Sequence, residues 1–275
     1  MFEGLIKYYN NLIDADKPVC PIAHTYLTCH VGILLDIDGK FLCAQIPEVS
    51  GELIPVPCTI QSGARTSGIA PHLLSDNIAY VADMPRYEER HRAYIEQLKD
   101  YVSLVPDDKY ANSIYKYTKS GTILDDLKDL LPKIKKIPSY KINIIFCVYG
   151  LPNEGADLQW TKYYLSTLPQ NGVCCVTGKR DHIPASYPAG ILSQSGNERL
   201  FLEDFPVGYI ASQKIIHALQ YMLYAAQNVD RVETEYYLKL YITKKITDEE
   251  LINWISKKYP MADRKKVLNL FTDKD

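Results

Sequence analysis

Two β-rich runs joined by an Asp-Gly turn commit this chain to a fold that contains a sheet. Residues 25–36 and 41–46 are rich in β-branched and apolar residues. Between them, Asp38 and Gly39 form one of the dipeptides that most strongly favour a two-stranded hairpin. Residues 53–58 continue the β pattern, and their two prolines indicate an edge or irregular strand. These segments predict a sheet near the start of the chain.

Helical patterns surround and follow this sheet. Residues 141–148 predict one more buried strand, but most other apolar residues recur at helical spacing. The expected helices cover residues 2–13, 86–105, 107–131, 158–168 and 210–226. The fold class is therefore α+β, with an N-terminal domain of mixed or antiparallel sheet and packed helices. We expect this domain to span residues 1–225, and residues 226–275 to form a short strand and helical C-terminal extension.

The composition is that of an ordinary globular protein. Of the 275 residues, 47% are hydrophobic and 23% are charged, which supports a sizeable core. No apolar run approaches the roughly 20 residues of a membrane-spanning helix, and the N-terminus does not have the pattern of a signal peptide. The seven cysteines form no C-x-x-C pair, which favours reduced thiols in the cytoplasm. Four of them are expected to be buried in strand-like surroundings: Cys29, Cys43, Cys58 and Cys147.

No motif in the sequence identifies a catalytic centre or a metal site. There is no G-x-S-x-G elbow, H-E-x-x-H helix, Walker lysine loop or dinucleotide fingerprint. His217 lies in an apolar helix and is better explained as a satisfied core histidine than as a base. Asp36 and Asp38 have the spacing of cation ligands, but the Gly39 that follows favours a solvated turn. We expect no enzymatic activity, no cofactor and no metal.

A small polar loop after the third strand is the first candidate for binding. Arg65 is followed by Thr66, Ser67 and Gly68, which places a guanidinium beside two hydroxyls and free backbone N–H groups. Such a cluster suits contacts with phosphate. Asn77, further on, offers paired hydrogen bonds to a base edge. An equally good explanation is a surface loop in which Thr66, Ser67 and Asp76 satisfy nearby backbone groups.

A second polar loop covers residues 193–199 and is the other candidate for binding. Lys179 and Arg180 precede it with positive charge. Its candidate residues are Ser193, Gln194, Ser195 and Asn197. The alternative is an ordered surface loop or an interface with another protein. The formal net charge of −2 gives no support to a stand-alone nucleic-acid binder, although a local patch is compatible with it.

Several short blocks of sequence carry a family resemblance. The most specific is residues 65–72 (RTSGIAPH), continued by Leu74, Asp76 and Tyr80. Weaker blocks lie at residues 21–25, 37–41, 54–59, 157–166, 175–178, 193–196 and 218–223. Taken in this order, over roughly residues 1–225, the chain resembles the large subunit of the type I-C CRISPR surveillance complex, Cascade.

This resemblance implies a protein that works inside a ribonucleoprotein complex. There the guide RNA reads sequence by base pairing, and protein reads a short adjacent motif and the shape of the duplex. The large subunit would sit at the 5′ end of the guide RNA, and DNA cleavage would belong to a separately recruited helicase-nuclease. The implied partners are the guide-capping and backbone subunits of Cascade, the guide RNA and the target duplex DNA. Through the resemblance, His72 joins the candidate binding residues.

Two departures from the family pattern leave the role open. We find no counterpart after residue 225 of the family's helical C-terminal half, and the acids Glu198, Glu203 and Asp204 would oppose a phosphate backbone. The chain is therefore either a working large-subunit module or a truncated copy, carried by a virus or mobile element, that acts as a decoy and blocks interference. An unrelated small enzyme is the remaining hypothesis, and turnover that is lost on His72→Ala would support it.

Overall fold

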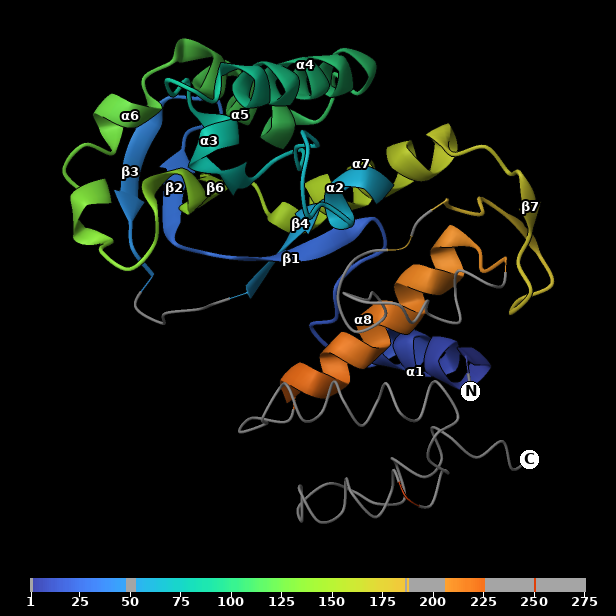
Figure 1. Cartoon of the computed structure of the whole chain (residues 1–275). Coiled ribbons are helices and arrows are strands. Elements are labelled where there is room, and N and C mark those ends of the chain that lie inside the picture. The colour runs from blue at the N-terminus through green and yellow to red at the C-terminus, as the bar shows by residue number, and fades with distance from the viewer. Residues whose placement is uncertain (1, 48–52, 186, 188–205, 226–249, 251–275) are drawn as a thin grey trace. The chain divides into compact units, whose positions relative to one another are not determined.

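The computed structural model describes residues 2–47, 53–185, 187, 206–225 and 250 (Figure 1). The chain divides into two compact units. The central unit is Ala23–Thr167, and the terminal unit combines Met1–Ile22 with Leu168–Asp275. The expected strand and helices after residue 226 lie outside the described residues, so the domain boundary at residue 225 stays a prediction.

A four-stranded mixed sheet forms the centre of the central unit. In spatial order its strands are β3 (Phe41–Gln45), β2 (Val31–Leu35), β6 (Asn143–Val148) and β5 (Asp76–Asn77). β2 pairs antiparallel with β3 and parallel with β6, and β5 pairs antiparallel with β6. The predicted α+β class and the predicted hairpin are both confirmed.

The turn between β2 and β3 is built by one carboxylate and one glycine. Oδ1 of Asp36 accepts hydrogen bonds from the backbone N–H groups of Asp38 at 2.9 Å and Lys40 at 2.8 Å. Gly39 has a φ of +80°, and a Cβ at this position would collide with the carbonyl oxygen of Ser113. The Asp36 carboxylate thus serves the turn, as the turn interpretation predicts.

A second, two-stranded sheet pairs β1 (His24–Thr28) antiparallel with β4 (Leu53–Pro57). The run of residues 25–36, which reads as one strand in the sequence, is therefore divided between two sheets. The division occurs at His30, whose Nδ1 accepts the backbone N–H of Asn143 at 2.8 Å. The side-chain amide of Asn143 also donates to the Thr28 carbonyl at 3.0 Å, so the end of β1 is held beside β6.

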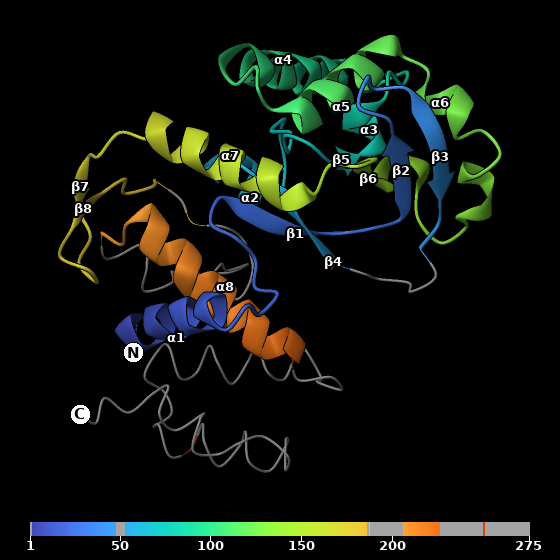
Figure 2. The same ribbon diagram turned by 180° about the vertical axis from the view of Figure 1, so that it is seen from behind.

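Helices cover one face of the four-stranded sheet. In Figures 1 and 2, α3 (Ile78–Val81), α4 (Glu88–Leu104) and α5 (Lys109–Ser120) lie on the same side of it. The Tyr110 hydroxyl donates to the Phe146 carbonyl at 2.6 Å, and the Tyr117 ring packs edge-on against the Phe146 ring. Gly121, with a φ of +75°, ends α5 and divides the helix expected over 107–131. The other helices of the central unit are α2 (Ile60–Gly63), α6 (Ile123–Asp126), η1 (Leu131–Lys133), η2 (Ser139–Lys141) and α7 (Asn153–Thr167).

Aromatic side chains fix α7 in the central unit. The indole N–H of Trp160 donates to the Ala23 carbonyl at 2.9 Å, just before β1. Its ring stacks on Tyr164, with the ring centroids 5.0 Å apart, and meets Tyr101 of α4 edge-on. Figure 2 shows α7 beside α2 and β1. The helix therefore gives α2, and the loop after it, a rigid support.

In the terminal unit, α1 (Phe2–Asp14) packs against α8 (Tyr209–Ala225). Their shared core includes Leu5, Tyr9, Ile215 and Leu219. His217 of α8 is 3% exposed, and its ring nitrogens lie 3.0 Å and 3.1 Å from the amide oxygens of Gln220 and Gln213. The interpretation of His217 as a satisfied core residue is confirmed. A short hairpin completes the described part of this unit: β7 (Gly172–Val173) and β8 (Arg180–Asp181).

All seven cysteines are free thiols. Cys29 and Cys58 are buried as expected, and burial raises the pKa of the Cys58 thiol. Cys147 is half-buried, and the expectation for Cys43 is wrong because this residue is exposed on the edge strand β3. In the part of the chain that the structure describes, no helix is long and apolar enough to cross a membrane.

Candidate functional site

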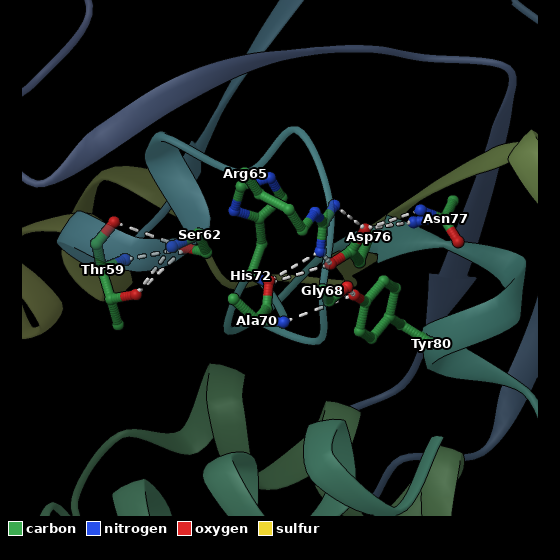
Figure 3. A network of polar contacts seen from close by, with 9 residues as sticks. All are labelled: Thr59, Ser62, Arg65, Gly68, Ala70, His72, Asp76, Asn77 and Tyr80. Carbon is green, nitrogen blue, oxygen red and sulfur yellow. Dashed lines mark hydrogen bonds and ion pairs between the residues drawn. The ribbon is translucent and has the colours of Figure 1, made fainter. Parts of the chain in front are cut away.

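The first polar loop begins at α2, which is held at its start by a capping box. Oγ1 of Thr59 accepts the Ser62 N–H at 3.0 Å, and Oγ of Ser62 accepts the Thr59 N–H at 2.9 Å (Figure 3). The Ile60 N–H donates to the hydroxyl of Tyr164 in α7 at 2.7 Å. The helix is therefore fixed from two sides, and Arg65 extends from a defined position just after it.

Arg65 and Asp76 close this loop with a bidentate ion pair. Both hydrogen bonds, from Nη1 to Oδ2 and from Nη2 to Oδ1, measure 2.8 Å. The side chain of Asp76 is fully buried, whereas that of Arg65 is 15% exposed. Burial opposes the charge of Arg65, but the hydrogen bonds to Asp76 outweigh it and raise the pKa of the guanidinium. The pair joins the start of the loop to β5.

The Asp76 carboxylate also orders the backbone around it. Oδ2 accepts the His72 N–H at 2.9 Å, and Oδ1 accepts the Asn77 N–H at 2.7 Å. The Asn77 side-chain amide donates to the same Oδ1 at 3.1 Å. Both oxygens of the buried charge are therefore satisfied, as a stable buried carboxylate requires.

Tyr80 completes the base of the loop. The guanidinium carbon of Arg65 lies 4.5 Å from the centroid of the Tyr80 ring. The Tyr80 hydroxyl donates to the Gly68 carbonyl and accepts the Ala70 N–H, each at 3.4 Å. Nη1 of Arg65 donates to the Ala70 carbonyl at 2.7 Å. The backbone on both sides of the loop tip is thereby fixed (Figure 3).

The tip itself faces solvent. Thr66, Ser67, Gly68 and Ile69 are all exposed, and Gly68 has a φ of +78° with open space around it. Arg65 carries five N–H donors, of which three make the hydrogen bonds to Asp76 and Ala70. The arrangement therefore presents two hydroxyls and backbone N–H groups on a rigid base, while most of the guanidinium serves the fold.

His72 lies beneath this base. It is 5% exposed, and burial lowers the pKa of its imidazole to about 4. The imidazole is therefore neutral near pH 7. Its burial argues against direct contact with a ligand in this conformation.

The family comparison connects this loop with a known class of proteins. The family model of a CRISPR-associated protein (Cas_Csd1) matches residues 5–271. This chain belongs to the Cas_Csd1 family. The family is that of the type I-C Cascade large subunit, so the predicted resemblance is confirmed. The matched range runs past residue 225 and includes most of the segment that the sequence analysis treats as an extension. A comparison with curated proteins finds no match.

The structure of this Cas_Csd1 chain gathers only some of the predicted site residues. Arg65, His72 and Asn77 surround the Asp76 carboxylate, and residues 66–69 form the exposed tip. The Asn77 amide nitrogen donates to Asp76 and its amide oxygen is buried, so this oxygen does not face solvent. The binding roles assigned to these residues stay predictions.

The other predicted residues of the Cas_Csd1 chain belong to the terminal unit or lie outside the described residues. Lys179 and Arg180 are exposed on the β7–β8 hairpin, where the Lys179 carbonyl accepts the Cys174 N–H at 2.9 Å. Four predicted residues lie outside the described residues: Ser193, Gln194, Ser195 and Asn197. No group of three or more potential metal ligands occurs among the residues that the structure describes.

Two residues that shape the site, Tyr80 and Arg90, have no role predicted from the sequence, although both surround the loop base. For Asp76 the sequence predicts only that its side chain satisfies nearby backbone groups, which it does for His72 and Asn77; its ion pair with Arg65 is not predicted. The available signal in the sequence was an acid, Asp76, in a largely apolar segment that follows an arginine, since a carboxylate that becomes buried needs a charged partner. The family block from 65 to 80 contained both members of the Arg65–Asp76 pair.

Proposed function

We propose that this chain works as the large subunit of type I-C Cascade and docks at the 5′ end of the guide RNA. The observation that carries the proposal is the family match over residues 5–271. In this role the central unit takes part in recognising the motif that adjoins the target, and base pairing by the guide reads the rest. The partners are the guide-capping and backbone subunits, the guide RNA and the target duplex.

The geometry of the first polar loop supports a binding role at this position. The exposed tip, Thr66 to Ile69, stands on a base fixed by the Arg65–Asp76 pair and by Tyr80. A loop that is already ordered loses little conformational entropy when it meets a partner. Its hydroxyls and N–H groups are donors of the kind that contact phosphate and sugar.

We propose that the role is non-catalytic. The ionisable groups nearest to the loop serve the fold: Arg65 and Asp76 neutralise each other, and His72 is buried with a pKa of about 4. General acid–base catalysis favours a group that titrates near the working pH. Binding, rather than proton transfer, is the chemistry that this arrangement supports.

The deciding experiment is complementation in a type I-C system whose large-subunit gene is deleted. Expression of this chain is expected to restore the loss of a targeted plasmid, and the chain is expected to co-purify with the other Cascade subunits. Expression in the complete system is the second arm. A chain that blocks interference there, and restores nothing in the deletion strain, refutes the subunit role and supports the decoy hypothesis.

A further inference from the structure

Cations and aromatic rings form a continuous series of contacts from the base of the first polar loop to the surface of the central unit. At the inner end, Arg65 lies over the Tyr80 ring at 4.5 Å. The guanidinium carbon of Arg90, on α4, lies 5.5 Å from the centroid of the same ring and 5.3 Å from that of Tyr87. Tyr80 is buried, whereas Arg90 and Tyr87 are half-buried. The series therefore leads outward from the loop.

The outer end reaches η2. The rings of Tyr87 and Tyr140 stack at 5.5 Å with an interplanar angle of 19°, and Nζ of Lys141 lies 5.7 Å from the Tyr140 centroid. These contacts exist because α3 packs against both α4 and η2. We call the whole series the cation–aromatic ladder: Arg65, Tyr80, Arg90, Tyr87, Tyr140 and Lys141.

The ladder ends in a concentrated positive charge. Residues 132–141 contain four lysines and no acid, in a chain whose net charge is −2. All four are exposed: Lys133, Lys135, Lys136 and Lys141. None of them forms an ion pair with a described residue. Asp125, Asp126 and Asp129 lie just before the segment in sequence, and Glu88 and Glu89 follow Tyr87 at the start of α4. None of these acids forms an ion pair with the four lysines. The positive charge of the lysine segment is therefore available to a binding partner.

We propose that the lysine segment (residues 132–141) and the outer end of the ladder bind the phosphate backbone of duplex DNA. Unpaired lysines on one exposed segment suit sequence-independent contacts with phosphate. Single-stranded nucleic acid needs free aromatic faces on which bases stack. Here Tyr87 and Tyr140 already stack on each other, and each also lies beside a cation. The surface therefore suits a backbone better than unstacked bases.

This inference extends the proposed function, since it names the surface that holds the duplex, and it is tested on the full chain alone. A short labelled DNA duplex is titrated at several salt concentrations. Each phosphate contact contributes about −0.9 to the slope of log affinity against log salt. The variant Lys133→Gln/Lys135→Gln/Lys136→Gln is expected to make this slope shallower by about 2 to 3. The matched control Lys99→Gln/Lys109→Gln/Lys162→Gln removes the same charge from other exposed lysines of the central unit and is expected to keep the slope.

Three outcomes would overturn the inference: equal slopes for the two triple variants, no duplex binding at low salt, or an effect confined to single-stranded RNA of the same length. Circular dichroism verifies that both variants are folded. The proposed function fails in a different way. If the chain binds the duplex through these lysines but does not co-purify with Cascade subunits, the proposed DNA-binding surface is supported and the proposed subunit role is refuted.

Discussion

Arg65 and Asp76 form two parallel hydrogen bonds of 2.8 Å each around a carboxylate that solvent does not reach. The pair closes the loop between α2 and β5, and the same carboxylate holds the backbone of His72 and Asn77. The stability of this loop therefore depends on these two side chains, and the proposed binding role of the tip depends on the base that they hold. Variants that separate the two effects are the most informative.

Loss of the Arg65 guanidinium is expected to destabilise the central unit strongly. Arg65→Ala leaves the buried Asp76 charge without its cation, which typically costs about 3 to 5 kcal/mol. Arg65→Lys is expected to recover only part of this, since lysine cannot form the bidentate pair. Urea denaturation measures both. The exposed Arg92→Ala is the control, expected within about 0.5 kcal/mol of wild type. Equal stabilities of Arg65→Ala and Arg92→Ala would contradict this account.

Protonation of His72 is expected to weaken the fold in mild acid. Burial lowers the pKa of this imidazole to about 4, below its ordinary value of about 6.5, so the unfolded chain binds the proton more tightly. The stability that His72 contributes is complete above about pH 6.5 and is lost as the pH falls toward 4. Between pH 7 and pH 5 we expect a loss of about 2 kcal/mol. The comparison is with His72→Gln, whose stability should change less over the same interval; parallel pH profiles would refute the assignment.

Removal of the two hydroxyls at the loop tip is expected to change binding without changing stability. Thr66 and Ser67 are exposed, so Thr66→Ala/Ser67→Ala should alter the unfolding free energy by less than about 0.5 kcal/mol. If the tip contacts nucleic acid, the affinity of the assembled complex for its target falls. Ser103→Ala/Ser166→Ala, at exposed positions on α4 and α7, is the matched control. Target affinity that is the same for both double variants would remove the tip from the interface.

Two glycines with similar backbone angles allow the cost of backbone strain to be measured apart from the cost of a steric collision. Gly39 and Gly121 have φ values of +80° and +75°. A Cβ on Gly121 meets open space, whereas one on Gly39 collides with the Ser113 carbonyl and lies 2.9 Å from the Lys116 Cβ. We expect Gly121→Ala to cost about 1 to 2 kcal/mol from backbone strain alone. Gly39→Ala should cost at least about 2 kcal/mol more, in the range of overpacking. Thermal or urea unfolding of the two variants gives the difference, and equal losses would disprove the contact.

Much of the fold is predictable because its signals are local. The Asp-Gly hairpin, the charged helix α4 and the apolar helix α8 follow from turn chemistry and hydrophobic spacing. The division between β1 and β2 is not local, because it depends on hydrogen bonds from Asn143, far along the chain. The exposure of Cys43 likewise depends on β3 being the sheet edge, which only the pairing order determines.

The position of the candidate site can be predicted from the sequence, but the contacts that its residues make cannot. A small polar loop with an arginine has the same sequence signature whether the guanidinium meets a phosphate or an internal carboxylate. Arg65 and Asp76 are 11 positions apart, and only the path of the chain brings them together. The cation–aromatic ladder is harder still, since it joins residues of three separate segments.

The parallel pairing of β2 with β6 also has a consequence for how the central unit folds. His30 and Asn143, which hold the two strands in register, are 113 positions apart in sequence. Closing so long a loop is slow, and a parallel strand has no hairpin through which it can form early. During synthesis, β2 therefore exposes an unpaired edge until residues 143–148 leave the ribosome. A substitution that adds charge at a partly exposed position of β2, such as Leu34, should consequently affect yield and aggregation during expression as well as the stability of the finished protein.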